Sequence, residues 1–425
     1  MSRSWMMTVL LGVPVLLMAW GSLRYTLTPL GYWLAWGLWA GVVVIDAWLG
    51  RASNGWVWPT AWVAGSFGLL ALGMVVASGI NQDGVALYQA AKILVIGILC
   101  WIMWQLAARA DAESLLRVLY GALALVTLVF FLSKAFSSAS YNLGGSREGD
   151  IFARAGVLWK AGLFFLPLCV ADWLCNPRRW VAAACAIGAC LFLVVIDGSR
   201  TGLLLIVVIS LGFGAVLWGR GDWRAVRHRP WTLPLAAGVL LALLLLNAGM
   251  NAWKYGLYPP ASATVSESSR VEALVNQAIA PVVDNRLGKG DAPRLRLLRN
   301  GLEKSRECFP LGCGFGSTAI DAGYGIPMNV HNAYLGALAD FGLLGLLGML
   351  GFVVASVLPL RALWDRSADP GRVYFTLATA GSALAYCVAL GLHTFSTEMS
   401  EWGYLLLMLA FAWQPVRGLD GPARI

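Results

Sequence analysis

The sequence has 425 residues, of which 59% are hydrophobic and 12% charged, and its mean hydropathy is +0.70. Soluble globular chains carry about 25% charged residues, so a soluble fold is excluded because it could not bury this much apolar surface. The net charge of +9 is divided among short hydrophilic breaks and forms no single basic face. This distribution argues against nucleic-acid binding and indicates a role of the charges in membrane topology.

Twelve apolar segments predict an all-α, polytopic membrane protein, since a transmembrane helix needs about 20 apolar residues. The first segment follows Arg3 directly and lacks a small-x-small cleavage site, so we expect a retained helix and not a removed signal peptide. The predicted helices lie near residues 5–22, 31–49, 57–77, 89–107, 115–136, 153–174, 180–197, 202–218, 232–248, 333–362, 373–392 and 402–416.

The short connections between these helices are alternately rich and poor in arginine. Because arginine accumulates on the cytoplasmic side, this alternation predicts that both termini are cytoplasmic. The connections placed in the cytoplasm hold Arg51, Arg109, Arg117, Arg178, Arg179, Arg220, Arg224, Arg227, Arg229, Arg361, Arg366 and Arg372, and the C-terminal tail adds Arg417 and Arg424. The opposite connections hold Arg24, Arg147, Arg154 and Arg200.

One long hydrophilic loop divides the chain into residues 1–248 with nine helices, the loop 249–330, and residues 331–425 with three helices. The orientation places this loop outside the cytoplasm. Its excess of basic residues defies the topological trend, which long loops escape, and favours an anionic ligand. Within the loop, residues 291–307 predict an amphipathic helix, with Leu295, Leu298 and Leu302 on one face and Pro293 in the first turn. Residues 259–270 are rich in serine and predict an irregular segment.

The eight cysteines do not form a disulfide framework, because six of them lie in or beside apolar segments. Cys308 and Cys313 lie in the long loop, where an oxidising compartment would allow a disulfide. Cys308 follows a predicted helix and Cys313 lies in a glycine-rich turn, so the spacing leaves both the bonded and the free state open.

Arg200 is the first candidate functional residue, in Asp197-Gly198-Ser199-Arg200-Thr201-Gly202 at the outer end of the seventh helix. An arginine so close to hydrocarbon is costly unless it is paired or binds a ligand. The alternatives to a functional role are an extended side chain that reaches lipid phosphates, or an ion pair with Asp197.

His331 is the second candidate, in His331-Asn332-Ala333-Tyr334-Leu335 at the start of the tenth helix. The helix dipole disfavours an imidazolium there, and a neutral imidazole is what a general base requires. The alternative is an interfacial histidine that only forms hydrogen bonds. His393 is a second candidate base, whereas His228 lies among cytoplasmic arginines and is expected to be incidental.

The arginines of the loop helix are the third candidates, because a guanidinium fork matches phosphate oxygens. They are Arg294, Arg296 and Arg299. The alternative is a solvated helix face with Glu303 and Glu307 as ion-pair partners.

Two further patterns are weak. Residues 312–316 resemble a phosphate-binding glycine loop, but no Lys-Ser/Thr follows and no strand precedes them. Glu148 and Asp150 form the one short acidic pair of interest, and the spacing of His and Cys residues predicts no metal site.

Taken together, these fragments resemble the O-antigen ligase and polymerase family of bacterial envelope glycosyltransferases. The segment from Arg294 to Leu298 resembles the family's Arg-x-x-x-Trp, with Leu298 in place of the Trp and Arg296 as the alternative match. Residues 310–316 resemble Pro-Leu-x-Gly-x-Gly. His331-Asn332-x-x-Leu335, followed by Gly342 and Gly345, resembles the family's His-Asn-x-x-Leu and trailing glycines. The specific resemblance covers roughly residues 190–350.

The resemblance implies an O-antigen ligase of lipopolysaccharide biosynthesis with a fold like that of the C-type glycosyltransferases, in the bacterial inner membrane. Such an enzyme moves a glycan from undecaprenyl diphosphate to a terminal sugar of lipid A–core on the periplasmic side, without nucleotide or metal cofactor. His331, Arg200 and Arg294 would be catalytic. The substrate-binding residues would be Arg200, Arg294, Arg296, Asn332 and Ser199.

Two alternatives stay open. One is an O-antigen polymerase or another glycosyltransferase of the same family. The other is a polytopic transporter, which should carry charges near the bilayer midplane. The predicted helix centres are nearly free of charge, and the charged residues within helices lie nearer their ends. These residues are Asp46, Lys92, Lys160 and Asp172.

Overall fold

The computed structural model describes residues 3–21, 23, 28–48, 57–136, 148, 150, 152–153, 156–222, 226, 230–256, 292–321, 327–365 and 369–414. In these residues the regular structure is helical, and a single antiparallel bridge joins Ile320 to Met328. The predicted all-α fold is confirmed. The predicted Ser-rich segment 259–270 and His228 lie outside the described residues.

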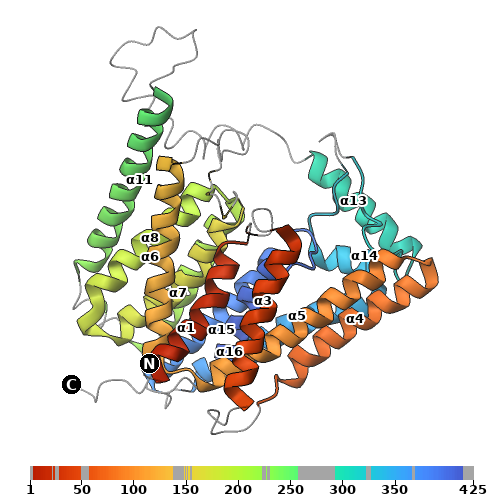
Figure 1. The fold of residues 1–425 in the computed structure, drawn as a ribbon, viewed down its shortest axis with the longest axis horizontal. Helices are drawn as coiled ribbons and strands as arrows, with labels where there is room; N and C mark the ends of the chain where they lie inside the picture. Colours follow the sequence, from red (N-terminus) through yellow and green to blue (C-terminus); the bar gives the residue numbers. More distant parts are fainter. Residues whose placement is uncertain are drawn as a thin grey trace. The chain divides into compact units, whose positions relative to one another are not determined.

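Each predicted transmembrane segment corresponds to one α-helix (Figure 1). The helices are α1 (Arg3–Ala19), α3 (Thr28–Asp46), α4 (Ala61–Asn81), α5 (Gly84–Arg109), α6 (Ala112–Phe136), α7 (Leu158–Cys175), α8 (Trp180–Asp197), α9 (Arg200–Arg220), α11 (Thr232–Gly256), α14 (Ala333–Val357), α15 (Pro370–Leu390) and α16 (Met399–Trp413). Within the described residues, ten helices are long and apolar enough to cross a membrane, and Trp5–Ala19 and Glu401–Trp413 are shorter apolar helices. The protein is therefore a multi-pass membrane protein.

Helix α5 begins at Gly84 and not at the predicted 89, and two other boundaries differ from prediction by as much or more. Helix α7 begins at Leu158, later than the predicted start at 153. Helix α11 continues to Gly256, so the first residues of the predicted long loop are helical. In each case hydropathy alone placed the boundary, and hydropathy does not report where a backbone hydrogen-bond ladder begins or ends.

The chain folds as two compact units, which are described separately. Unit 1 comprises Met1–Pro14, Ala35–Leu115 and Gly290–Ile425, and unit 2 comprises Val15–Leu34 and Leu116–Lys289. Residues 292–321 of the predicted long loop, including helix α13 (Ala292–Glu307), belong to unit 1 with the C-terminal helices. The predicted division at 248 and 330 does not coincide with these units and stays a prediction about topology.

Glycines determine how closely the helices of unit 2 approach. A Cβ atom on Gly162 of α7 would lie 2.6 Å from the carbonyl oxygen of Cys190 in α8, and one on Gly188 of α8 would lie 2.7 Å from that of Ala236 in α11. Small residues allow such close backbone contact where lipid provides no hydrophobic drive between helices. The Trp173 indole adds a hydrogen bond of 3.0 Å to the Thr232 hydroxyl, which joins α7 to α11.

Unit 1 is built on the α4–α5 hairpin and on α14, which packs against α4. A Cβ on Gly73 of α4 would lie 2.9 Å from the Phe341 carbonyl oxygen of α14. Phe67, Phe352 and Trp402 then form an aromatic cluster among α4, α14 and α16, with ring centroids 5.1–6.0 Å apart. The structure therefore fixes α14 in the middle of unit 1.

Helix α14 is interrupted at Gly342, whose φ of 70° and ψ of −160° are not helical. The interruption frees backbone groups that lipid could not satisfy, and the loop after α13 provides the partners. Cys313 N–H donates to the Ala339 carbonyl at 2.8 Å, and Gly314 N–H donates to the Asp340 carbonyl at 3.0 Å. Leu343 N–H donates to the Pro310 carbonyl at 2.8 Å. The loop thus replaces hydrogen bonds that the broken helix has lost.

We expect Gly342→Ala to destabilise the protein by about 3 kcal/mol or more. The position has a positive φ, and an added Cβ would overlap the carbonyl oxygen of Pro310. The matched control is Gly68→Ala in α4, where a Cβ meets nothing within 4 Å, so its unfolding free energy should stay the same or rise by up to about 1 kcal/mol. Unfolding midpoints in mixed detergent micelles measure both, and equal midpoints would contradict the steric argument.

Candidate functional site

His331 and Asn332 lie where α14 begins. Asn332 is the N-cap residue, and its side-chain oxygen accepts a hydrogen bond of 2.9 Å from Leu335 N–H. His331 therefore directly precedes the cap, close to the predicted place. Its side chain is half-buried, and its Nδ1 is buried without a hydrogen-bond partner among the described residues. A ring nitrogen without a protein partner is available to accept a proton.

The surroundings of His331 favour the neutral imidazole. Burial lowers its pKa below the ordinary value of 6.5, and the positive charge of Arg294 lowers it further. A hydrogen bond to the backbone of Asn329 acts in the opposite direction. The expected neutral state is therefore supported, but burial and Arg294 account for it, whereas the sequence argument relied on the helix dipole.

We expect carbethoxylation of His331, followed by peptide mass, to show half-maximal reactivity below pH 6.5, because only the neutral ring reacts. Arg294→Gln should move this midpoint upward, since removal of a nearby positive charge favours the protonated ring. Lys304→Gln, which removes a cation at the other end of α13, should leave the midpoint in place. An unchanged or lower midpoint in Arg294→Gln would contradict the assigned electrostatic effect.

Helix α13 carries Arg294 on the face that packs against α14. Leu297, Gly301 and Ser305 form its buried stripe, and a Cβ on Gly301 would lie 3.0 Å from Leu335 and 3.1 Å from Val330. Arg294 precedes Leu297 by three residues and Gly301 by seven, and this spacing keeps one helix face. The structure thus brings Arg294 and His331 together, and it explains Leu335 as the residue on which α13 packs.

The leucine face of this helix is exposed in the structure, and another face is buried. Leu295, Leu298 and Leu302 are 61%, 39% and 44% exposed. The helix itself and the place of Pro293 in its first turn are confirmed. A leucine pattern cannot reveal that a glycine, Gly301, provides the actual contact surface. Arg294, Arg296 and Arg299 are all exposed, as the alternative of a solvated helix face requires.

The glycine-rich loop binds the protein's own carboxylates. Phe315 N–H donates to Asp83 Oδ2 at 2.9 Å, and Gly316 N–H donates to Asp340 Oδ2 at 3.0 Å. The Ser317 hydroxyl donates to Asp340 Oδ1 at 2.7 Å. Two backbone N–H groups that a phosphate loop would offer to its ligand are therefore already used within the protein.

Asp83 and Asp340 are structurally important residues that the sequence argument missed. Asp83 lies in the α4–α5 turn, where Asn81 also donates to the Gly312 carbonyl at 3.0 Å, so the hairpin tip holds the loop at two points. Figure 1 shows α13 above this end of the α4–α5 hairpin. Asp340 lies inside a predicted transmembrane segment, and a carboxylate there marks a special site. That rule, applied to every helix, would have found it.

Cys308 and Cys313 form a disulfide with a Cα–Cα distance of 5.3 Å, which decides between the two open states. It closes the turn between α13 and the glycine-rich loop. In unreduced, denatured protein we expect alkylation of the six free cysteines, and of all eight after reduction. A Cys308→Ser variant should show the same number of adducts with and without reductant, and eight adducts in unreduced wild-type protein would contradict the pairing.

Arg200 lies in unit 2 as the first residue of α9. Gly198 ends α8 with a φ of 64°, and Ser199 caps α9 by accepting a hydrogen bond of 3.2 Å from Gly202 N–H. Asp197 is fully buried, and its Oδ2 accepts hydrogen bonds from Gly156 N–H at 2.8 Å and Trp159 N–H at 3.2 Å. The turn is thereby tied to the start of α7, and the Arg200 side chain is exposed.

The comparison with family models supplies the deciding finding. Residues 183–350 match the model described as O-Antigen ligase, Wzy_C. The chain carries a domain of the O-antigen ligase family. The match contains all six predicted site residues, namely Arg200, Ser199, Arg294, Arg296, His331 and Asn332. No curated protein matches the chain.

The family assignment makes the protein a glycosyltransferase-like membrane enzyme of the O-antigen ligase and polymerase type. Parts of unit 1 lie outside the matched segment yet contact its ligase-family motifs. Asp83 and Asn81 hold the glycine-rich loop, and Tyr334, three residues after His331, donates to the Cys387 carbonyl of α15 at 2.6 Å.

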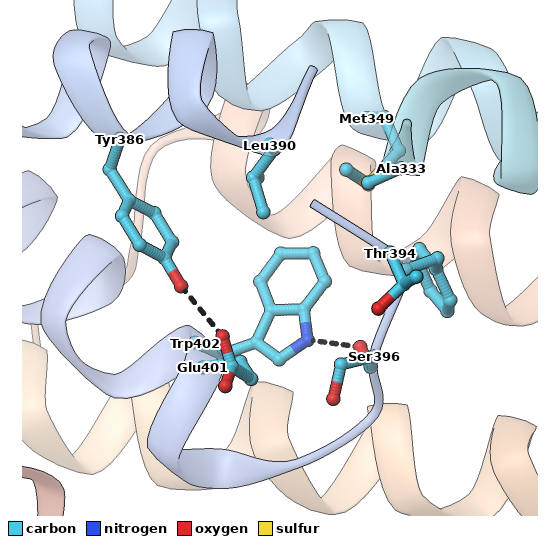
Figure 2. A pocket seen from close by; sticks show the side chains of 9 residues that line it. Ala333, Met349, Tyr386, Leu390, Thr394, Ser396, Glu401 and Trp402 are labelled. Atoms are coloured by element: carbon cyan, nitrogen blue, oxygen red, sulfur yellow. Dashed lines mark hydrogen bonds between the residues drawn. The ribbon is translucent and has the colours of Figure 1, made fainter. Parts of the chain in front are cut away.

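A small pocket lies beneath the start of α14 and is lined by residues of α14, α15, α16 and the α15–α16 connection. Figure 2 shows Ala333 on one side and, across from it, Tyr386, Glu401 and Trp402. The Tyr386 hydroxyl donates to Glu401 at 3.1 Å, and the Trp402 indole donates to the Ser396 carbonyl at 2.8 Å. The connection from α15 to α16, which also carries His393, is thereby fixed under the first turn of α14.

An ion pair within the helices ties the same connection to α5. Lys92 Nζ lies 2.7 Å from Glu398 Oε1, and the Thr397 hydroxyl donates to Gln89. Lys92 lies about two turns into α5, deeper than the sequence reading assumed. Asp46 and Arg109, at the ends of α3 and α5, pair at 3.0 Å.

The acidic residues Glu148 and Asp150 both accept hydrogen bonds within unit 2. Glu148 pairs with Lys134 and accepts a hydrogen bond of 3.0 Å from Asn251. Asp150 is buried, and its Oδ1 accepts hydrogen bonds from Phe152 N–H and Ala153 N–H at 2.7 and 2.6 Å. Burial raises its pKa to about 6. Across the described residues, no three His, Cys, Asp or Glu side chains form a group that could hold a metal ion.

Proposed function

We propose that the protein is an O-antigen ligase that transfers a glycan from undecaprenyl diphosphate to the terminal sugar of lipid A–core at the periplasmic membrane face. The observation that carries this proposal is the proximity of His331 to Arg294, because a neutral base and an exposed cation stand together at the start of a membrane-spanning helix. The family match supports the reaction class.

Each residue has a distinct role in the proposed reaction. His331 takes the proton of the acceptor hydroxyl as that oxygen attacks the anomeric carbon of the donor sugar. The bond to the diphosphate breaks, and undecaprenyl diphosphate leaves with the bonding electron pair. Arg294 stabilises the negative charge that develops on the leaving group, and the loop cation Arg296 assists in binding it. No metal or nucleotide enters the scheme.

Arg200 is proposed to bind donor phosphate, and the reasons come from unit 2 alone. It is exposed at the first residue of α9, where the helix N-terminus favours anions. Ser199 and Asn332 cap their helices through side-chain oxygens. The Asn332 amide nitrogen is used by no hydrogen bond within the described residues, and it is proposed to donate to substrate oxygen.

Lipopolysaccharide from a deletion strain tests the proposal. Loss of O-chain with retained lipid-linked polymer is expected for a ligase. A core that carries one repeat unit would instead identify an O-antigen polymerase. Unchanged lipopolysaccharide would exclude both the ligase and the polymerase function.

Orientation is part of the proposal and has its own test. We propose cytoplasmic termini and a periplasmic His331, as the arginine bias predicts. A single cysteine introduced at Glu303 in a cysteine-free variant should react with an impermeant reagent applied from the periplasm. Protection there, with labelling at position 222 instead, would reverse the orientation.

A further inference from the structure

Helix α13 has a second apolar face, which the protein leaves uncovered. Its inner stripe of Leu297, Gly301 and Ser305 is buried against unit 1. Leu295 and Leu302 are 61% and 44% exposed on a separate stripe, together with the less exposed Leu298. A helix that needed only its contact with α14 would not require three further leucines on an adjacent face.

This stripe lies near the level at which α14 enters the membrane. Gly301, in the middle of α13, packs on Leu335, which belongs to the first turn of the membrane-spanning helix α14. The turn that follows α13 adds two more exposed apolar side chains, Phe309 and Leu311, at 62% and 46% exposure. The apolar surface therefore continues beyond the helix at the depth of the membrane interface.

The polar border of the stripe is basic. Arg299 and Arg306 follow Leu295 and Leu302 by four residues each, so they continue the same face by one helical turn. Both arginines are exposed. Helix α13 has five basic residues against two acidic ones, Glu303 and Glu307. An apolar face bordered by arginine is complementary to a surface of acyl chains and anionic headgroups.

We propose that the outer face of α13 lies on the adjacent leaflet and binds anionic phospholipid. Leu295, Leu298 and Leu302 enter the boundary between headgroups and acyl chains, and Arg299 and Arg306 contact lipid phosphates. The helix is then held by α14 on one face and by lipid on the other. This arrangement fixes Arg294 at headgroup level, independently of any substrate.

Photo-crosslinking tests the surface directly. Benzoylphenylalanine is placed at position 298 or 302, and at the exposed position 303 as a matched control turned away from the stripe. The full-length protein is irradiated in nanodiscs of phosphatidylglycerol and phosphatidylethanolamine, without lipid-linked donor. Positions 298 and 302 should give phospholipid adducts at least five times more often than position 303. Equal yields at the three positions, or adducts with a second protein copy, would overturn the proposal.

A second measurement tests the arginines. Native mass spectrometry compares phosphatidylglycerol and phosphatidylcholine retained by the wild type, by Arg299→Gln/Arg306→Gln and by the control Glu303→Gln. The double variant should lose at least threefold of the preference for phosphatidylglycerol, and the control should keep it. An unchanged preference in the double variant, or adducts at 298 that require added polyisoprenyl diphosphate, would refute the lipid surface. Because donor is absent from the main assay, failure of the proposed ligase reaction leaves these results unaffected.

Discussion

His331→Ala should lower glycan transfer by about 10²–10⁴-fold, the usual contribution of a positioned general base, while donor still binds. The side chain lies one residue before the cap of α14, and its surroundings keep the imidazole neutral at pH 7. A neutral ring can take the acceptor proton without first losing one of its own. Turnover and donor affinity, measured separately with purified protein, distinguish a base from a residue that only binds donor.

His393→Ala provides the comparison for this result, because His393 lies in unit 1 but outside the segment that matches the family model. A larger loss of turnover in His393→Ala than in His331→Ala would transfer the base role to His393. A collapse of donor affinity in His331→Ala with unchanged turnover of bound donor would also exclude the base role. The same assay in chelator tests metal independence, and activity that only magnesium restores would refute it.

Arg294→Ala and Arg200→Ala should each reduce transfer by about 10²–10³-fold, as expected when a charge that stabilises the leaving group is removed. Lysine should restore little at either position, because it offers a point charge in place of a planar fork. Lys304→Ala is the matched control on α13. Its ion pair with Glu307 at 2.7 Å is exposed, and exposed pairs contribute little to stability.

Lipopolysaccharide profiles of complemented strains, normalised to membrane protein content, measure these variants. Near-normal O-chain in Arg200→Lys would argue against a bidentate contact with phosphate. A loss in Lys304→Ala equal to that in Arg294→Ala would show that α13 acts only through its overall charge. In that case the position of Arg294 beside His331 would not be important for transfer.

Hydropathy was sufficient to predict the ten helices that, among the described residues, are long and apolar enough to cross a membrane, because a span must be long and apolar whatever its neighbours are. The ends were harder, as α7 and α11 show, since caps and hydrogen bonds decide them. The start of α14 was an exception, because Asn332 is a good N-cap residue that can be recognised in sequence.

The surroundings of the candidate site were less accessible to sequence reasoning. His331 and Arg294 were predicted from their motifs, and Asp340 could have been found from its place inside an apolar segment. Asp83 could not, since its partner is a backbone N–H group of the glycine-rich loop. The type of a residue does not show which group its backbone N–H binds. Asp83 is also more than 200 residues from this loop in the chain, and a local pattern cannot report such a contact.

The break at Gly342 has a consequence for the order in which the protein assembles. The part of α14 before the break, Ala333–Phe341, is only about 13 Å long, too short to span a bilayer alone. Its Ala339 and Asp340 carbonyls are satisfied when residues 313 and 314 are in place, and the flanking residues Gly312 and Phe315 are hydrogen-bonded to the α4–α5 turn. That turn is synthesised long before α14. We therefore expect the early hairpin to act as a template on which the half-helix that follows His331 is completed.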